Sequence, residues 1–471
     1  MLTTDSTSCN RWLWPLALFS LTMFALALRW YYVSTAVVLN PVRGDAVQYY
    51  SYAWNLVHHG IFSKDVPSAP AINPDNYRDP GYPLFLALWM KALGAGSTWY
   101  AAVLLCQALL GALTVTLATQ LGRYWLPPSW AISAGLLMAV WPHSIAINGY
   151  LLTETLFGFL SALAMLLCAR ACRQVNPWWA IVAGLAFGAA ALTNAILLPF
   201  AVLLAGFLGW RKLVPRRICL ALAVGALLLP GAWAIRNTQI TVPKSDGSSM
   251  DRALQNLVQG TWPSYHSAWR NSALGDAATQ ARARVTLRAM DVEYNTLRVS
   301  PVKGTKAILQ RLGEHPMQYA AWYLLQKPYQ LWDWDIQIGQ GDIYVYPTKN
   351  APFQTSPAWI ALAAICHAIN PLLMFLALAS FWVAWSRARL YIARSAPANE
   401  AALVSVICLV MFATLVYTAL QAEPRYSIAF RPFEMLLALT TLAGFNQWRQ
   451  ERRQSTNQPV PVPVSTTAQH E

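Results

Sequence analysis

The stretch ICLALAVGALLLPGAWAI, residues 218–235, carries no charge and is bounded by Arg217 and Arg236. A helix of about 20 apolar residues crosses the roughly 30 Å hydrocarbon core of a bilayer. A shorter apolar piece stands at 81–93. The sequence therefore predicts an all-α polytopic membrane protein with about ten or eleven transmembrane helices. The other long apolar blocks lie at about 12–33, 98–121, 130–148, 151–169, 178–193, 195–210, 357–385, 401–421 and 431–447.

The composition agrees with this prediction. Hydrophobic residues make up 56% of the 471 positions and charged residues 11%, whereas a soluble protein keeps roughly a quarter of its residues charged. Many of the 22 Trp and 20 Tyr residues stand near the ends of apolar blocks, where their rings sit at headgroup level. Lipid therefore covers much of the chain.

The net charge of +14 does not indicate nucleic-acid binding. The Lys and Arg residues form short runs beside the apolar blocks, and no basic stripe with interleaved aromatic residues stands apart from them. Such runs set membrane orientation. They should face the cytoplasm at Arg123, Arg170, Arg173, Arg211, Lys212, Arg216, Arg217, Arg387, Arg389, Arg394, Arg449, Arg452 and Arg453.

These runs share one side of the membrane only if the piece at 81–93 does not cross it. We therefore interpret that piece as a re-entrant or juxtamembrane helix in a protein of the cell inner membrane, with both termini cytoplasmic. The predicted organisation is a transmembrane module at 1–236 with a first outer loop at 34–80, an extracytoplasmic domain of mixed structure at 237–356, transmembrane helices at 357–447 and a disordered cytoplasmic tail at 448–471.

Cysteine usage adds little to this organisation. None of the seven cysteines falls in the segment 237–356, so that domain is predicted to contain no disulfide. The spacing of Cys168 and Cys172 would suit a metal pair, but no other His or Cys stands nearby, and apolar packing is the simpler interpretation.

The topology also places several polar residues at or near the outer membrane face. Convergent polar groups beside a membrane are costly unless they serve a function. The set consists of Asp45, Arg78, Asp79, Glu154, Asn194, Arg236, Glu423 and Arg425.

Five of these residues also have a purely structural interpretation. Asp45 precedes a helical segment and could serve as its N-cap. Glu154 opens a span, where a carboxylate offsets the helix dipole. Arg78 could bind a phosphate, or pair with Asp79 or a lipid headgroup. Arg236 and Arg425 could be interfacial anchors.

Five tryptophans in the outer segment have two interpretations as well. They could bind sugar, although core packing is the simpler explanation. They are Trp262, Trp269, Trp322, Trp332 and Trp334.

Four stretches, taken in order, resemble the type C glycosyltransferases. They are Gly44-Asp45-Ala46, Arg78-Asp79-Pro80-Gly81-Tyr82-Pro83, Thr153-Glu154-Thr155-Leu156-Phe157 and Glu423-Pro424-Arg425-Tyr426. The chain is most similar to family 39-like bacterial relatives of the protein O-mannosyltransferases and of the lipid A aminoarabinose transferase. It departs from many relatives at Ala46, where they carry a second acidic residue, and at Asn194, where they carry an arginine.

The resemblance implies an inverting hexosyl- or pentosyltransferase that uses a polyprenyl-phosphate sugar at the outer, periplasmic face. The acceptor would be a lipid, a glycan or a protein. Asp45 would be the catalytic residue, and no cofactor is assigned, although a divalent metal ion held by Asp45 and Glu154 is an alternative. The substrate-binding residues would be Arg78, Asp79, Glu154, Arg236, Glu423 and Arg425.

The chemistry of these residue types suits the reaction. A carboxylate can accept the proton of the attacking hydroxyl, and arginines can stabilise the charge that grows on the leaving phosphate. The alternative function is a transporter or flippase for a lipid-linked or small polar substrate. Transporters often contain related halves with matching broken helices near mid-bilayer, and the sequence shows no such repeat.

Overall fold

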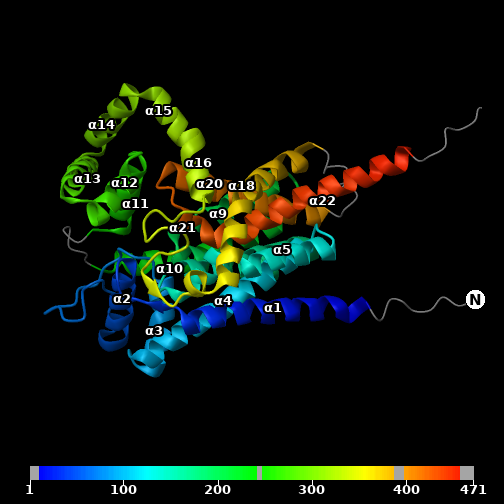
Figure 1. Cartoon of the computed structure of the whole chain (residues 1–471), viewed down its shortest axis with the longest axis horizontal. Helices are drawn as coiled ribbons and strands as arrows, with labels where there is room; N and C mark the ends of the chain where they lie inside the picture. The colour runs from blue at the N-terminus through cyan, green and yellow to red at the C-terminus, as the bar shows by residue number, and fades with distance from the viewer. Residues whose placement is uncertain (1–9, 241–246, 387–396, 457–471) are drawn as a thin grey trace, which may run out of the picture.

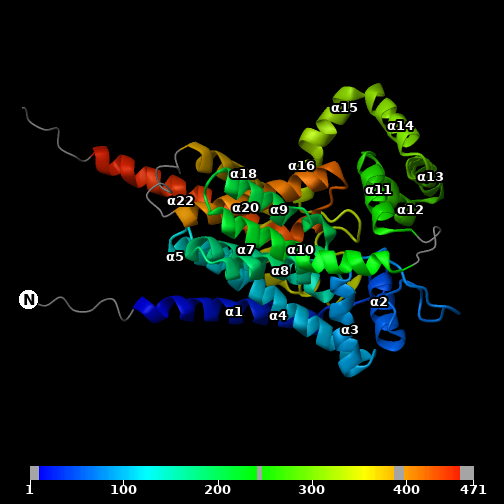
Figure 2. The same cartoon turned by 180° about the vertical axis from the view of Figure 1, so that it is seen from behind.

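The structure is a computed structural model that describes residues 10–240, 247–386 and 397–456. A bundle of helices occupies its centre, with the start of the first helix and the end of the last at the same end of the bundle (Figure 1). The first loop and helices α11–α15 lie at the opposite end (Figures 1 and 2). The runs at Arg387, Arg389 and Arg394 lie outside the described residues.

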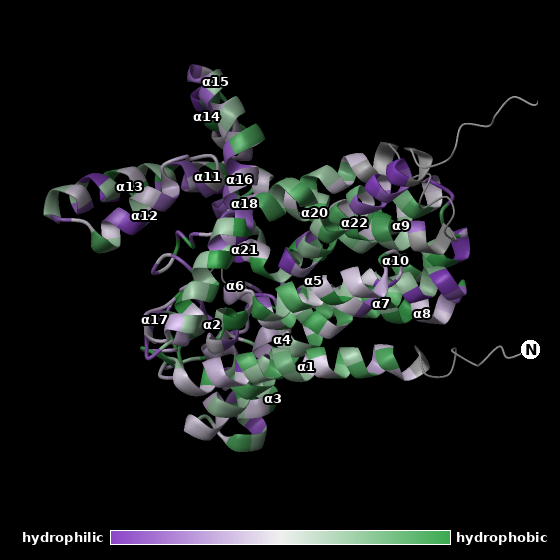
Figure 3. Cartoon of the chain, turned by 45° about the vertical axis from the view of Figure 1, so that its right-hand side comes forward, coloured by the Kyte–Doolittle hydropathy of each residue, from purple (hydrophilic) through white to green (hydrophobic). Residues whose placement is uncertain are grey.

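Seven helices of the described chain are long and apolar enough to cross a membrane. Hydrophobic residues cover them, and hydrophilic residues gather at their ends and on the outer helices (Figure 3). The chain is therefore a multi-pass membrane protein. The spans lie in α1 (Asn10–Thr35), α4 (Ser97–Gly122), α7 (Glu154–Gln174), α10 (Arg216–Thr238), α18 (Pro357–Ser386), α20 (Pro397–Ala419) and the segment that ends in α22 (Arg431–Thr456).

An eighth predicted span, at 130–148, is broken. It divides into α5 (Pro128–Val140), α6 (Pro142–Ala146) and η1 (Ile147–Gly149), with a bend of 59°. The bend falls before Pro142, because a residue that precedes proline is pushed towards an extended conformation, as Trp141 is at φ −68° and ψ 119°.

The count of about ten therefore includes shorter elements. It is reached in the described chain only when the bent pair and the two shorter apolar segments are added to the seven. These segments are α8 (Pro177–Thr193), and η2 (Ala195–Leu197) followed by α9 (Phe200–Trp210).

Helix α3 (Gly81–Leu93) has the bounds of the short predicted helix. At 1.5 Å per residue it is about 20 Å long, too short to span the hydrocarbon core. A Cβ on Gly81 would stand 2.5 Å from the Thr193 hydroxyl and 2.8 Å from the Leu192 carbonyl. Gly81 therefore lets the start of α3 approach the end of α8, which brings the preceding Arg78 and Asp79 close to the bundle.

The outer segment, predicted to be of mixed structure, is mainly helical and has a non-helical stretch at 333–351. Its single described strand, β2 (Thr348–Lys349), pairs antiparallel with β1 (Val37–Val38), so that Val37 is opposite Lys349. This pairing ties the outer segment to the end of α1. The helices are α11 (Ser249–Gly260), α12 (Tyr265–Leu274), α13 (Ala277–Val299), α14 (Pro301–Glu314), α15 (Pro316–Ala321), η3 (Trp322–Gln326), α16 (Lys327–Trp332) and α17 (Pro352–Thr355).

Two other predictions concern the chain's ends and cysteines. Helix α22 continues to Thr456, so the predicted disordered tail begins with helix, and residues 457–471 lie outside the described part. A hydrogen bond of 3.1 Å from Gln447 to Glu451 supports this last part of the helix. Cys168 and Cys172 are buried in the apolar core around α7.

Candidate functional site

Asp45 is the first residue of α2 (Asp45–His59) and does not cap it. Gly44 occupies the N-cap position, and no side-chain bond caps the helix. Gly44 has φ +55°, a conformation that favours glycine, and a Cβ there would stand 3.0 Å from the Tyr346 hydroxyl. The N-cap interpretation of Asp45 is therefore wrong.

The Asp45 carboxylate instead lies between two arginines. Nη2 of Arg78 is 2.6 Å from Oδ1, and Nη2 of Arg425 is 2.9 Å from Oδ2. The Arg425 Nε is 2.9 Å from Oε1 of Glu154, the first residue of α7. The order Arg78, Asp45, Arg425, Glu154 thus alternates charge across four segments that are distant in sequence.

Two opposing effects act on the Asp45 carboxyl. Burial by itself raises its pKa, while the positive charges and hydrogen bonds of Arg78 and Arg425 lower it more strongly. The net result is a pKa well below the usual range for aspartate. The Asp45 side chain keeps 28% of its surface exposed, so it faces open space despite these contacts.

Arg78 is held by several neighbours besides Asp45. Its Nε donates to the Gln48 amide oxygen at 2.5 Å, and its guanidinium lies 5.1 Å from the centre of the Tyr49 ring. Gln48 and Tyr49 follow Asp45 on α2. One helix therefore fixes both the arginine and the carboxylate that it binds.

Arg425 lies on the short helix α21 (Pro424–Ser427), which η4 (Ile428–Phe430) joins to α22. Its guanidinium is 5.5 Å from the centre of the adjacent Tyr426 ring. Pro424 at the first turn of α21 has no N–H, which the first turn of a helix does not need. The turn thus aims Arg425 back towards α2 and α7.

These residues line a cavity of about 330 Å³, which we name the Asp45 cavity. Six of the seven predicted site residues contribute to it, together with Asn194 at the end of α8. Its lining consists of Asp45, Tyr49, Tyr77, Arg78, Asp79, Thr153, Glu154, Thr193, Asn194, Arg252, Gln255, Asn256, Gln259, Tyr265, Ile338, Tyr417, Leu420, Gln421, Glu423, Arg425 and Tyr426.

Asp79 does not pair with Arg78. Its Oδ2 is 2.9 Å from Nη2 of Arg252 on α11 and accepts the backbone N–H of Ala195 at 3.2 Å. Asp79 therefore joins α8 to the outer segment, and it brings a third arginine, Arg252, to the cavity wall. Arg252 is not among the predicted site residues, since no local pattern marks it.

Arg236 is the predicted site residue that does not line the Asp45 cavity. Its Nη1 donates to the backbone carbonyl of Asp75 at 2.8 Å, and its guanidinium lies 4.7 Å from the centre of the Trp233 ring. Asp75 in turn accepts the backbone N–H groups of Lys64 and Tyr77. Arg236 thus holds the first outer loop against α10.

Glu423 lies in the cavity wall, in the turn between α20 and α21. Its Oε1 accepts the backbone N–H groups of Gln337 and Ile338 at 2.9 and 3.2 Å, and its Oε2 is 3.4 Å from Nε2 of His266. Burial raises the pKa of Glu423 to about 7 and lowers the pKa of His266 to about 4. Arg425 opposes the shift of Glu423 only in part.

Comparisons with known proteins agree with this architecture. Residues 74–233 match the family model described as dolichyl-phosphate-mannose-protein mannosyltransferase. The structure superposes on the crystal structure of the Archaeoglobus fulgidus oligosaccharyltransferase in the apo form with a TM-score of 0.52 and 14% identity, over 95% of this chain and 52% of that chain. The crystal structure of the same enzyme in complex with Zn and sulfate superposes with a TM-score of 0.50 and 13% identity, over 93% of this chain and 50% of that chain.

The chain has the fold of the type C glycosyltransferases. The predicted resemblance and the predicted fold class are thereby confirmed. The chain spans about half the length of the archaeal enzyme. ArnT from Cupriavidus metallidurans bound to undecaprenyl phosphate superposes with a TM-score of 0.35 and 13% identity, over 95% of this chain and 81% of that chain, too low a score to add to the argument. No curated protein matches the sequence.

Asp45 and Glu154 are poorly arranged to bind a divalent metal ion. In the described chain no three His, Cys, Asp or Glu side chains are grouped to bind one. The predicted ligands Asp45 and Glu154 are joined through Arg425, which binds both. Two guanidinium groups thus already supply positive charge at Asp45, and a metal ion there would have to displace one of them.

Proposed function

We propose that the protein is an inverting glycosyltransferase of the inner membrane. It would move a hexosyl or pentosyl group from polyprenyl phosphate to an acceptor hydroxyl at the periplasmic face. The observation that carries the proposal is Asp45 held between Arg78 and Arg425 in one cavity. A lipid-phosphate donor is supported by the family model, whose description names dolichyl phosphate mannose.

The arginines suit a phosphate leaving group. A guanidinium binds two phosphate oxygens through parallel N–H groups, and it stays charged at every accessible pH. Arg78, Arg425 and Arg252 all line the Asp45 cavity. Negative charge that develops on the phosphate as the C1–O bond breaks would be stabilised by groups that are already in place.

Asp45 would accept the proton. The acceptor oxygen attacks the anomeric carbon from the face opposite the phosphate, the new C–O bond forms as the phosphate leaves, and the hydroxyl proton passes to Asp45. In the ligand-free arrangement both Asp45 oxygens are bonded to arginines and the carboxyl is a weak base. A donor phosphate would compete for those arginines, which would raise the pKa of Asp45 when the sugar is bound.

Glu154 would act as a positioning residue. It is bonded to the Nε edge of Arg425, while Nη2 of the same arginine reaches Asp45. Glu154 therefore fixes the plane of the guanidinium. A second negative charge beside Arg425 also offsets the cost of holding a cation in this partly enclosed site.

Two measurements test the proposal. Purified protein given a polyprenyl-phosphate sugar should release polyprenyl phosphate only when an acceptor is present, and envelope glycans of a deletion strain should lack one sugar by mass spectrometry. Failure of both would overturn it.

Orientation is tested separately by reporter fusions. Fusions after Arg173, Arg217 and Arg394 should report cytoplasm, and fusions near Gly275 and Pro424 should report the outside. An outside signal after Arg217 would contradict a periplasmic site.

A further inference from the structure

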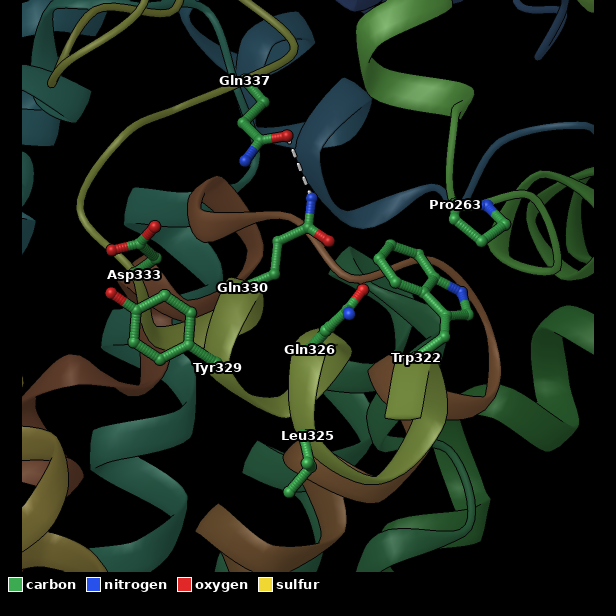
Figure 4. Close-up of a pocket in the computed structure, with 8 residues that line it drawn as sticks. All are labelled: Pro263, Trp322, Leu325, Gln326, Tyr329, Gln330, Asp333 and Gln337. Carbon is green, nitrogen blue, oxygen red and sulfur yellow. Dashed lines mark hydrogen bonds between the residues drawn. The ribbon is translucent and has the colours of Figure 1, made fainter. Parts of the chain in front are cut away.

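A second cavity, of about 540 Å³, lies at the foot of the helical arm formed by α15, η3 and α16. We name it the Trp322 cavity. In Figure 4 a bonded pair of amides, Gln330 and Gln337, occupies the middle, with Trp322 and Pro263 on one side and Tyr329 and Asp333 on the other. Its lining consists of Pro263, Trp322, Leu325, Gln326, Tyr329, Gln330, Asp333 and Gln337.

Only a thin wall separates the Trp322 cavity from the Asp45 cavity. Gln337 lines the first and the next residue, Ile338, lines the second. Likewise, Pro263 lines the Trp322 cavity, and Tyr265, two residues further along the chain, lines the Asp45 cavity. Consecutive Cα atoms are about 3.8 Å apart, so the wall is about one residue thick at these places. Glu423 fastens it by accepting both the Gln337 and Ile338 N–H groups.

The wall and the aromatic side are rigidly built. The Trp322 indole N–H donates to the Gly260 carbonyl at 3.0 Å, and the buried Lys327 donates to the same carbonyl at 2.9 Å and to that of Leu420 at 2.6 Å. Gln330, itself more than nine-tenths buried, donates to His266 at 2.8 Å and to Gln337 at 3.1 Å. The cavity is therefore preformed.

The lining chemistry narrows the class of ligand. It includes no lysine or arginine among the described residues and one carboxylate, Asp333, so it does not suit a phosphate or another anion. Gln326 offers both a donor and an acceptor, and the Gln337 amide nitrogen offers donors. Gln330 donates to His266 and Gln337 and can offer only its amide oxygen. These groups match the hydroxyls of a sugar. The Tyr329 side chain is 53% exposed and offers a flat apolar surface, which matches the C–H face of a pyranose ring. Trp322 lines the cavity with the small part of its side chain that is not buried.

We propose that the Trp322 cavity binds a neutral saccharide portion of the acceptor. This inference rests on the proposed function and names the acceptor class as a glycan. An acceptor glycan with one hydroxyl near Asp45 continues past the wall at Ile338 and Gln337 and places its next sugars against Trp322 and Tyr329. The donor phosphate stays on the arginine side, and the two substrates are sorted by charge.

The test uses the full-length protein in amine-oxide micelles, which carry no sugar headgroup. Saturation-transfer difference NMR would be recorded with maltotriose, cellotriose and tri-N-acetylchitotriose, and with a neutral hexapeptide for comparison. Gln326 and Tyr329 are exposed residues of the lining, so Gln326→Ala and Tyr329→Ala should fold normally. Leu324 is exposed on the same turn and does not line the cavity, which makes Leu324→Ala the matched control.

At least one trisaccharide should bind the parent protein, and its Kd should rise about threefold to tenfold in each lining variant but not in Leu324→Ala. In transfer assays Tyr329→Ala should raise the acceptor KM and leave kcat nearly unchanged. The inference is overturned if no trisaccharide binds, if both lining variants bind as the parent does, or if the peptide binds in their place.

The outcomes separate the two proposals. Asp45→Asn should retain trisaccharide binding, since Asp45 does not line the Trp322 cavity. If the parent protein binds a trisaccharide but transfers no sugar, the proposed function is contradicted and the saccharide site is supported. Transfer that depends on Asp45, with an acceptor KM that Tyr329→Ala does not change, would support the proposed function and contradict the saccharide site.

Discussion

Arg425 and Arg431 lie on the same short stretch between α20 and the body of α22, and each binds a carboxylate. Arg425 bonds to Asp45 and Glu154 beside the Asp45 cavity. Arg431 is 1% exposed and bonds to Glu434 at 2.9 Å. It also donates to the amide oxygen of Asn370 and to the backbone carbonyls of Trp332 and Asp333.

The difference lies in what surrounds each arginine. Arg431 fastens α16 to the bundle, and a buried charge of this kind is strongly destabilising when its partner is removed. Arg425 borders the Asp45 cavity. Two arginines six residues apart in one segment thus differ in whether their guanidinium groups are enclosed by protein or border a cavity.

The largest effect on stability is expected at Arg431 and its buried partners. Arg431→Ala should lower the free energy of unfolding by about 3–5 kcal/mol, because Glu434 is left as an unpaired buried charge. Fluorescence-detected size exclusion after heating would show it. Arg425→Ala is the matched comparison and should lose much less stability, since cavity water can reach Asp45 and Glu154. Equal losses of stability in Arg431→Ala and Arg425→Ala would contradict the proposed difference between the two arginines.

Activity should rank the arginines in the opposite way. Arg78→Ala and Arg425→Ala should lower donor use by about 30- to 1000-fold, because a lost charge-assisted contact to an enclosed phosphate costs about 2–4 kcal/mol. Arg236→Ala should have a smaller effect, since Arg236 binds the Asp75 carbonyl outside the cavity. Initial rates at limiting donor are the measurement, and near-normal rates for Arg78→Ala and Arg425→Ala would leave them as interfacial anchors.

Glu423 gives a smaller, pH-dependent prediction. Its raised pKa means that the folded state holds a proton between the unfolded value and about pH 7, so the contribution of Glu423 to stability falls as the pH rises through that window. His266, with its lowered pKa, acts in the opposite direction below about pH 6.5.

Glu423→Gln should therefore gain stability relative to the parent between pH 5 and pH 8, on the order of 2–3 kcal/mol. Melting temperatures of both proteins across that range test the shift. Parallel curves would show that Glu423 does not titrate there.

The sequence predicted the bundle well because apolar blocks fix the positions of membrane helices. The bounds of α3 agree with the predicted short helix, and its not crossing the membrane stays a prediction that rests on the basic runs at Arg123 and Arg217. The bend before Pro142 was not predicted, because the apolar block continues through it. The outer segment was expected to be mixed, and it combines several helices with one short strand, β2, that pairs with β1.

The site was predictable in part. The predicted topology placed Asp45, Glu154 and Arg425 at or near the outer membrane face. In the structure Arg425 contacts both Asp45 and Glu154. Arg252 was missed because its partner, Asp79, is remote in sequence and no motif links them. Arg236 was included as an arginine at the predicted outer face that could bind the donor phosphate, and neither property indicates which loop its side chain contacts. The roles of these residues remain predictions.

Whether Asp45 accepts the acceptor proton is tested most directly by Asp45→Asn. Asn keeps the size of the side chain and one acceptor oxygen, so it can still bind one of the two arginines. Arg78 also keeps Gln48 and Arg425 keeps Glu154 as partners. The variant should therefore fold and bind the donor, yet its transfer rate with a polyprenyl-phosphate sugar should fall by about 100-fold or more, because an amide cannot accept the proton. A rate within a few-fold of the parent protein would contradict the account and direct the search for the base to Glu154.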